Sequence, residues 1–159
     1  MPPFRAALNA GVSTFMNAFN DVNGIPATGN TYLLRELLKG EWNFGGFVVS
    51  DWNSVGEMIN HGIVSDLKGA ALRGTLAGCD MDMESHAYTS HLEELVKEGM
   101  IDEKYIDDAV RRILLKKFEL GLFDDPFRYC SEQRQQQIVL SQELKEVARE
   151  AGRSSIVLL

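Results

Sequence analysis

Short apolar runs alternate with helix signals through the first half of the chain, and this alternation restricts the fold more than any other feature. The runs lie at 11–19 (GVSTFMNAF), 47–50 (FVVS) and 79–83 (CDMDM). Periodicity alone cannot separate runs of this length from helix, but repeated strand–helix units favour a parallel sheet. We therefore predict an α/β fold with parallel strands.

Polar residues that can cap helices mark where each helix should begin. In such a cap the side chain accepts a hydrogen bond from a backbone N–H of the first turn. The expected caps are Asn30, Ser65, Ser90 (in a capping box with Glu93), Asp102 and Ser141, for helices over 30–39, 66–77, 90–99, 102–120 and 141–153. The 102–120 helix should bury one apolar face. That face consists of Ile106, Ala109, Val110, Ile113, Leu114 and Phe118.

The composition indicates a globular protein and argues against two classes of partner. With 45% hydrophobic and 25% charged residues, 159 residues are suited to one folded domain. The formal net charge of −7, with no basic cluster, argues against nucleic acid and anionic membrane as partners. No run of about 18 apolar residues predicts a membrane span. Cys79 and Cys130 lack CxxC spacing and indicate neither a metal site nor a disulfide framework, and no cofactor is expected.

The stretch GFVVSDW (46–52) ends in an acid that a buried strand does not require. Phe47, Val48 and Val49 are suited to such a strand, and Asp51 and Trp52 follow at its tip. The simplest interpretation is that the Asp51 side chain caps the following turn.

Asp80 and Asp82 alternate along CDMDM and should share one face of a strand. Paired carboxylates can bind metal ions, but no third or fourth ligand lies at useful spacing, so no metal site is expected. Asp80 either holds the loops structurally or contacts a substrate. The three histidines, His61, His86 and His91, are assigned to surface or capping roles. The charged residues of the 102–120 helix are assigned to its solvated face, and they are Asp107, Asp108, Arg111 and Arg112.

Three segments of the chain resemble glycoside hydrolase family 3, in its β-glucosidase-like branch. They are FNDVNGIPATGNTYLLRELLKGEWNFGGFVVSDW (19–52), LAGCDMDM (76–83) and IDDAVRRILLKKFELGLFDDPF (106–127). The final AREAGRSSIVLL (148–159) resembles the passage in which that family enters a second domain, an α/β sandwich. The segments occur in the family's order and spacing, and the resemblance as a whole extends over nearly the whole chain.

The resemblance implies the C-terminal part of a (β/α)₈ TIM-type barrel. Because a complete barrel takes about 250 residues, this chain would supply about three βα units. Residues 1–123 would form these units with their closing helices, 124–154 a linker and helix, and 155–159 the truncated start of the sandwich domain. The family's lysine–histidine pair and its general acid have no counterpart here, so the isolated chain is expected to be inactive.

The resemblance also implies a retaining glycosidase that removes terminal β-D-glucosyl residues from oligosaccharides or aryl glucosides. One carboxylate attacks the anomeric carbon and a second carboxyl group protonates the leaving oxygen. Reactive groups of barrels lie at the carboxyl ends of strands, so Asp51 becomes the expected nucleophile. Trp52 is then either a wall of the sugar site or a core aromatic residue. Met16 and Phe19 either border that site or fill the barrel core, and many family members carry tyrosine in place of Phe19.

Alternatives to the glucosidase interpretation remain. Within the family they are a β-xylosidase and a β-N-acetylglucosaminidase, and outside it a non-catalytic carbohydrate-binding or assembly fragment. SDW and the long linker into SIVLL favour a β-glucosidase or a β-xylosidase, because acetylglucosaminidases typically carry a second Asp and Leu after the nucleophile. Unpaired barrel edges should promote self-association. The resemblance suggests a periplasmic or secreted protein, although the start MPPFRAALNAG lacks the regions of a signal peptide.

Overall fold

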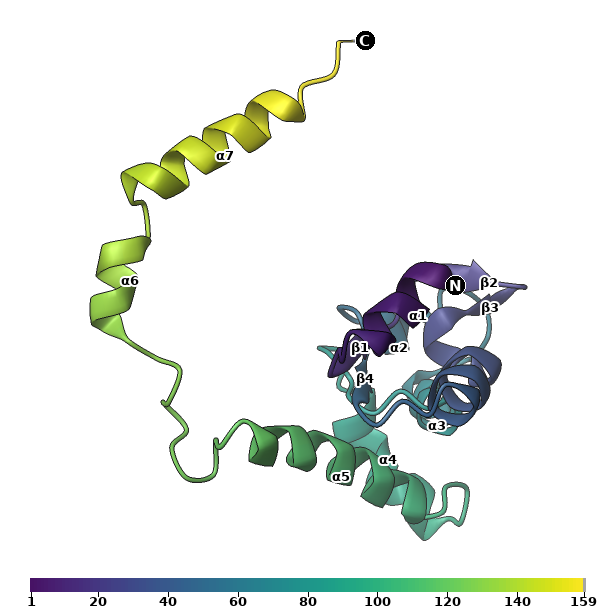
Figure 1. Cartoon of the computed structure of the whole chain (residues 1–159). Helices are drawn as coiled ribbons and strands as arrows, with labels where there is room; N and C mark the ends of the chain where they lie inside the picture. Colours follow the sequence, from purple (N-terminus) through teal and green to yellow (C-terminus); the bar gives the residue numbers. More distant parts are fainter. Residues whose placement is uncertain (159) are drawn as a thin grey trace. The chain divides into compact units, whose positions relative to one another are not determined.

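The structure is a computed structural model that describes residues 1–158 (Figure 1). The chain divides into a first unit, Met1–Leu120, and a second unit that begins at Gly121. Each unit is described separately below. Within the described part of the chain, no helix is both long enough and apolar enough to cross a membrane.

Two strands of the first unit form a parallel pair. β1 (Thr14–Met16) lies beside β4 (Phe47–Val49), with Thr14 opposite Phe47 and Met16 opposite Val49. On its other side β4 makes a single parallel bridge between Val49 and Met81. The parallel pairing predicted from the alternation is confirmed for β1 and β4. The strand expected at 79–83 was wrong in length, because only Met81 pairs.

A hairpin that the sequence analysis missed follows β1. β2 (Asp21–Val22) pairs antiparallel with β3 (Ile25–Pro26). Asn23 (φ 55°) and Gly24 (φ 76°) turn the chain between them. Two consecutive positive φ angles are what a tight hairpin needs, and Asn-Gly is the dipeptide best suited to them.

Helices make up most of the structure. In the first unit they pack around the short strands. Their bounds are α1 (Pro2–Asn9), the 3₁₀ turn η1 (Ala27–Gly29), the π-helix η2 (Tyr32–Glu41), α2 (Ser54–Glu57), α3 (Leu67–Ala77), α4 (Ala87–Lys97), α5 (Lys104–Glu119), α6 (Glu132–Ile138) and α7 (Gln142–Ser154).

Of two helix caps predicted from the sequence, one is confirmed and one is displaced by a residue. Asn30 Oδ1 accepts a hydrogen bond from Leu33 N–H at 3.1 Å, which confirms this cap at the start of η2. Ser65 was wrong by one residue, because Asp66 Oδ1 accepts from Gly69 N–H at 2.7 Å and caps α3. A carboxylate is the stronger acceptor beside the positive end of a helix.

The capping box predicted at Ser90 is wrong, since α4 already begins at Ala87. Its first turn is held from the preceding loop instead. Asp82 Oδ2 accepts from Tyr88 N–H at 3.3 Å, and Ser85 Oγ accepts from Ala87 N–H at 3.2 Å. The Ser85 hydroxyl in turn donates to the Asp82 carboxylate at 2.6 Å. This anchoring also explains why CDMDM does not form a longer strand, because Asp82 serves the helix.

The core of the first unit lies between β4 and the helices. Gly46 permits the close approach of β1 and β4, because a Cβ there would collide with the Ser13 carbonyl and the Phe44 ring. Gly74 serves the packing of α3 on α4, because a Cβ would lie 2.8 Å from the Tyr88 hydroxyl. The buried cluster consists of Leu34, Leu38, Phe44, Val48, Val55, Met58, Ala70, Ala71, Cys79, Ala87, Leu95 and Ile101.

The face of α5 predicted to be buried is half-buried at Ile106, Ala109 and Ile113 and exposed at its other three residues. Val110, Leu114 and Phe118 are 47%, 44% and 69% exposed, so this part of the prediction was wrong for the described structure. The amphipathic pattern is present, but no other element of the first unit covers this end of α5. Arg112 differs from its predicted solvated role: its Nη1 donates to the Phe44 and Gly46 carbonyls, each at 2.9 Å.

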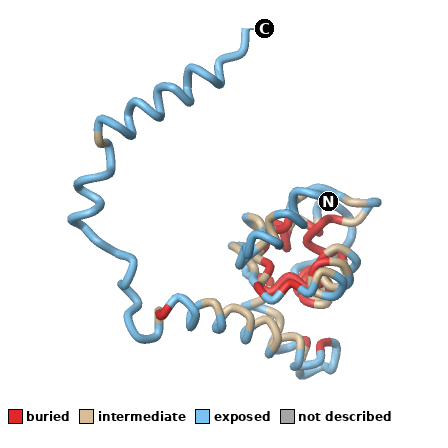
Figure 2. The backbone as a smooth tube through the Cα atoms, viewed as in Figure 1, coloured by how far each residue is buried: buried red, intermediate tan, exposed pale blue. Residues whose placement is uncertain are grey.

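The second unit consists of α6 and α7, and nearly all its described residues are exposed (Figure 2). The Ser141 cap is confirmed, because its Oγ accepts from Leu144 N–H at 3.4 Å. The apolar run that was expected to open a sandwich strand, 156–158, forms no strand and is exposed. Leu159, the last residue of that run, lies outside the described residues.

The two cysteines should react with thiol reagents at different rates. Burial raises the pKa of the Cys79 thiol to about 12, whereas Cys130 is exposed. In the native chain, we expect a disulfide reagent such as dithionitrobenzoate to modify Cys130 rapidly and Cys79 only after denaturation. Between about pH 9 and 12 the unfolded state loses the Cys79 proton first, so the folded state should lose stability across that window. Equal rates of thiol modification in a Cys130→Ser variant and the wild-type chain would contradict the expected difference between the cysteines. An unfolding free energy that does not fall between about pH 9 and 12 would contradict the expected loss of stability.

Candidate functional site

The Asp51 side chain stands where β4 ends. Val48 is fully buried in the strand, Ser50 is buried behind it, and Asp51 is half-buried. Its Oδ1 accepts a hydrogen bond from Trp52 N–H at 2.7 Å. Its Oδ2 has no hydrogen-bond partner among residues 1–158. One carboxylate oxygen is thus oriented by the backbone, and the other is free to act on a ligand.

The turn after β4 is closed mainly by backbone groups. The Asp51 carbonyl accepts from Ser54 N–H at 3.1 Å and from the Ser50 hydroxyl at 2.9 Å. The short helix α2 begins at Ser54, and its N-cap Asn53 makes no side-chain cap bond. The Asp51 carboxylate contributes a single local bond, to the next residue along the chain.

Asn17, which the sequence analysis did not single out, lies behind Asp51 at the end of β1. Its N–H donates to the Val49 carbonyl at 3.1 Å and continues the ladder of β1 and β4. Its Oδ1 accepts from Asp51 N–H at 3.4 Å, from the Ser54 hydroxyl at 3.2 Å and from the Thr28 hydroxyl at 3.0 Å. The one signal for Asn17 in the sequence is its place inside the apolar run at 11–19, because a polar side chain buried there requires several hydrogen-bond partners.

The loop after Met81 is tied to the loop that carries Asp51. Met83 N–H donates to Ser50 Oγ at 2.7 Å, and Asn53 N–H donates to the Met83 carbonyl at 2.8 Å. Asn53, Glu84 and His86 have φ angles of 55°, 75° and 59°. Such angles are uncommon outside glycine and gather at ligand-binding and active sites. The two loops therefore hold the residues on either side of Asp51 in one defined arrangement.

The other predicted site residues occupy different positions. Trp52 is 61% exposed beside Asp51, and Met16 is 55% exposed on β1, opposite Val49. Phe19 is half-buried in the turn that leads to β2. The structure thus places Trp52 and Met16 near the end of β4 with exposed side chains.

Asp80 is buried, and both of its carboxylate oxygens accept hydrogen bonds. Its Oδ1 accepts from Lys39 Nζ at 2.5 Å, and its Oδ2 accepts from Val48 N–H at 2.8 Å. The Lys39 and Asp80 side chains are 5% and 4% exposed. Burial lowers the pKa of Lys39, and the Asp80 carboxylate opposes this shift. Asp80 and Asp82 do not act as a pair, because Asp82 binds Ser85 and α4. In the described part of the chain, no group of three or more His, Cys, Asp or Glu side chains could hold a metal ion.

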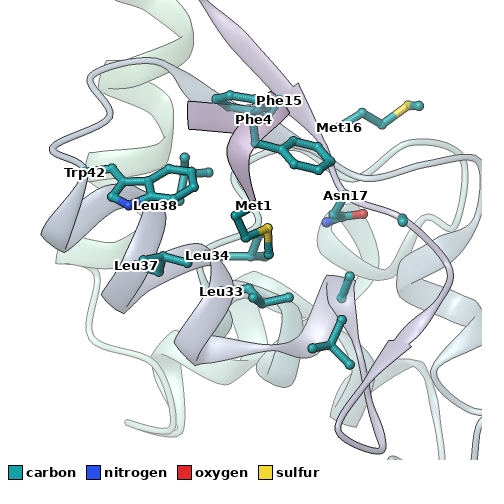
Figure 3. A pocket seen from close by; sticks show the side chains of 13 residues that line it. Met1, Phe4, Phe15, Met16, Asn17, Leu33, Leu34, Leu37, Leu38 and Trp42 are labelled. Carbon is teal, nitrogen blue, oxygen red and sulfur yellow. The ribbon is translucent and has the colours of Figure 1, made fainter. Parts of the chain in front are cut away.

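An apolar hollow of about 230 Å³ lies beside β1 and η2 (Figure 3). Phe4, Phe15, Leu33, Leu37 and Trp42 are among the residues around it. Asn17 is the polar side chain of its lining, and Met16 is also part of it. A surface with so little hydrogen-bonding capacity is suited to apolar chain segments rather than to a sugar.

Residues 1–115 match the model of the glycosyl hydrolase family 3 N-terminal domain, and the chain belongs to this family. A periplasmic β-glucosidase of Salmonella typhimurium is 38% identical over the whole chain, which covers 21% of that relative. A β-xylosidase of Formosa agariphila is also 38% identical over the whole chain, with 23% of its length covered.

A solved structure of a β-glucosidase from Listeria innocua in complex with glucose is similar to the entire chain, with a TM-score of 0.87 and 43% identity. The chain covers 22% of that protein. An aspartate-to-alanine variant of the same enzyme was solved in complex with laminaribiose. The chain therefore spans about a fifth of the length of the relatives it matches.

Proposed function

We propose that this chain carries the nucleophile of a retaining glycoside hydrolase that releases terminal β-D-glucosyl residues. The observation that carries the proposal is the Asp51 carboxylate at the end of a parallel strand, with Oδ1 held at 2.7 Å by Trp52 N–H and Oδ2 unpartnered among residues 1–158. Membership of glycosyl hydrolase family 3 supports it. The similarity to a Listeria innocua β-glucosidase that was solved in complex with glucose also supports it.

In the proposed first step, an Asp51 oxygen attacks the anomeric carbon and forms an ester bond to it. The bond from that carbon to the leaving oxygen breaks, and a carboxylic acid gives the leaving oxygen its proton. In the second step a water molecule gives its proton back to that acid and attacks the same carbon, which releases Asp51 as a carboxylate. We place the acid in the part of the relatives' length that this chain does not cover.

Exposed side chains beside Asp51 would form the sugar site. An aromatic ring offers a flat apolar face to a sugar ring, and Trp52 is exposed next to the nucleophile. Met16 is exposed on the neighbouring strand, and Phe19 would border the same subsite. Asp80 would act indirectly, by holding Val48 of β4 and η2 together behind the site.

For the fold, we propose that the first part of the chain supplies the last three βα units of a TIM-type barrel. The parallel pair of β1 and β4, the parallel bridge at Met81 and the similarity to the Listeria innocua enzyme support this. Residues 1–123 would form these units, 124–154 a linker and helix, and 155–159 the start of an α/β sandwich domain. The name of the Salmonella relative supports a periplasmic location.

A panel of aryl glycosides tests the substrate. The full-length gene product should release nitrophenol fastest from the β-glucoside, whereas faster release from the β-xyloside would favour the second candidate, which the Formosa agariphila relative supports equally by identity. The same test covers the β-N-acetylglucosaminide. The isolated 159 residues should release none, because they lack the proposed acid. Turnover by this chain alone would overturn that assignment of the acid.

The isolated chain should also self-associate with a second copy of itself. Val110, Leu114 and Phe118 expose apolar surface on α5, and among the described residues β1 pairs only with β4, which leaves one strand edge open. Size-exclusion chromatography with light scattering should give a mass above that of the monomer, and a Leu114→Glu, Phe118→Glu variant should shift it toward the monomer. A compact monomer with a sharp cooperative melting transition would contradict this expectation.

A further inference from the structure

The geometry points to Asn17 as a positioning residue that fixes the main chain of Asp51 and thereby aims its carboxylate. This inference rests on the proposed function, because it concerns how the proposed nucleophile is held. Asn17 lies at the end of β1 and Asp51 just beyond the end of β4, so one side chain links two neighbouring strand ends.

The Asn17 side chain is nearly saturated with partners. Its Oδ1 accepts from Thr28 Oγ1 at 3.0 Å, from Ser54 Oγ at 3.2 Å and from Asp51 N–H at 3.4 Å, and its Nδ2 donates to Cys79 Sγ at 3.5 Å. The residue is 5% exposed. Four segments of the chain therefore meet at one amide, which cannot turn without leaving buried polar groups unpaired.

Asn17 acts on Asp51 through the backbone. The N–H of Asp51 is held by Asn17 Oδ1, and Oδ1 of Asp51 is held by Trp52 N–H. These two bonds fix the main chain from which the carboxylate projects and the orientation of the carboxylate itself. A misplacement of about 1 Å at a reacting group costs about 100-fold in rate. Loss of the first bond should therefore affect the chemical step more than substrate binding.

Two measurements test this inference independently. In the 159-residue chain, Asn17→Ala should speed hydrogen exchange of the Asp51 amide by at least about tenfold, because its acceptor is gone. In the full-length gene product, the same variant should lower kcat for nitrophenyl β-glucoside by about 100-fold and change KM less than about threefold. Leu95→Val is the control, because it loosens the core through α4, which contributes no residue to the proposed site.

The outcomes separate this inference from the proposed function. Unchanged exchange of the Asp51 amide in Asn17→Ala would overturn it, and so would a kcat loss no larger than that of Leu95→Val. Wild-type protein without turnover of any aryl glycoside would overturn the proposed function, while the exchange measurement would still decide whether Asn17 holds Asp51.

Discussion

Replacing Asp51 with asparagine should lower kcat for an aryl β-glucoside by about 10⁴-fold or more in the full-length gene product. The amide has nearly the same shape and can still accept the Trp52 N–H bond, so the turn should persist. It carries no negative charge and cannot attack the anomeric carbon. The loss should therefore appear in kcat, measured as nitrophenol release at saturating substrate, with the melting temperature close to that of the wild type.

Two further variants make this result specific. Asp66→Asn is the matched control, since asparagine caps a helix as well as aspartate does and α3 contributes no group to the proposed chemistry. Asp51→Gly opens space for a small anion, and added azide should restore turnover and yield the α-glucosyl azide. Asp51→Asn activity within tenfold of the wild type would show that another group is the nucleophile.

Replacing Asp80 with asparagine should destabilise the fold by about 3–5 kcal/mol, because it leaves the Lys39 ammonium buried without its counter-charge. The Asp80 carboxylate is also the group that opposes the lowering of the Lys39 pKa by burial, so that pKa should fall further. Chemical denaturation followed by circular dichroism measures the change in unfolding free energy.

A double variant separates the effect of the unpaired Lys39 charge from the effect of the changed side chain at Asp80. Adding Lys39→Met to Asp80→Asn removes the unpaired charge and should recover part of the lost stability. Glu93→Gln breaks the exposed ion pair with Lys97 and should leave the midpoint almost unchanged, because solvent screens that pair. An Asp80→Asn variant that unfolds at the wild-type denaturant concentration would contradict the structural role of the buried pair.

Some helix starts could be predicted from local signals in the sequence. Asn30 and Ser141 accept bonds from N–H groups three residues on, and such caps depend only on the adjacent chain. Ser90 failed because the α4 start is held by Asp82, whose position depends on the loop after Met81. The exposed part of α5 shows the same limit, since an apolar pattern states that a face can be buried but not what covers it.

In the candidate site, the place of Asp51 could be predicted from the sequence, but the buried residues that support it could not. The position of Asp51 at a strand tip follows from GFVVSDW alone, because the apolar run ends where the acid begins. Asn17 could not be assigned, because two of its partners, Thr28 and Ser54, come from other elements of the chain. The Lys39–Asp80 pair spans 41 residues and joins η2 to the segment beside β4. Such contacts are fixed by tertiary structure, which no local pattern encodes.

Covalent trapping tests the nucleophile most directly. A 2-deoxy-2-fluoro-β-D-glucoside with a dinitrophenyl leaving group forms the glycosyl-enzyme, and its fluorine then slows hydrolysis of that intermediate. Incubated with the full-length gene product, it should release one equivalent of dinitrophenol and add one fluoroglucosyl group, and tandem mass spectrometry of the digest should place this group on Asp51. A label on another carboxylate, or equal labelling of the Asp51→Asn variant, would contradict the assignment of Asp51 as the nucleophile.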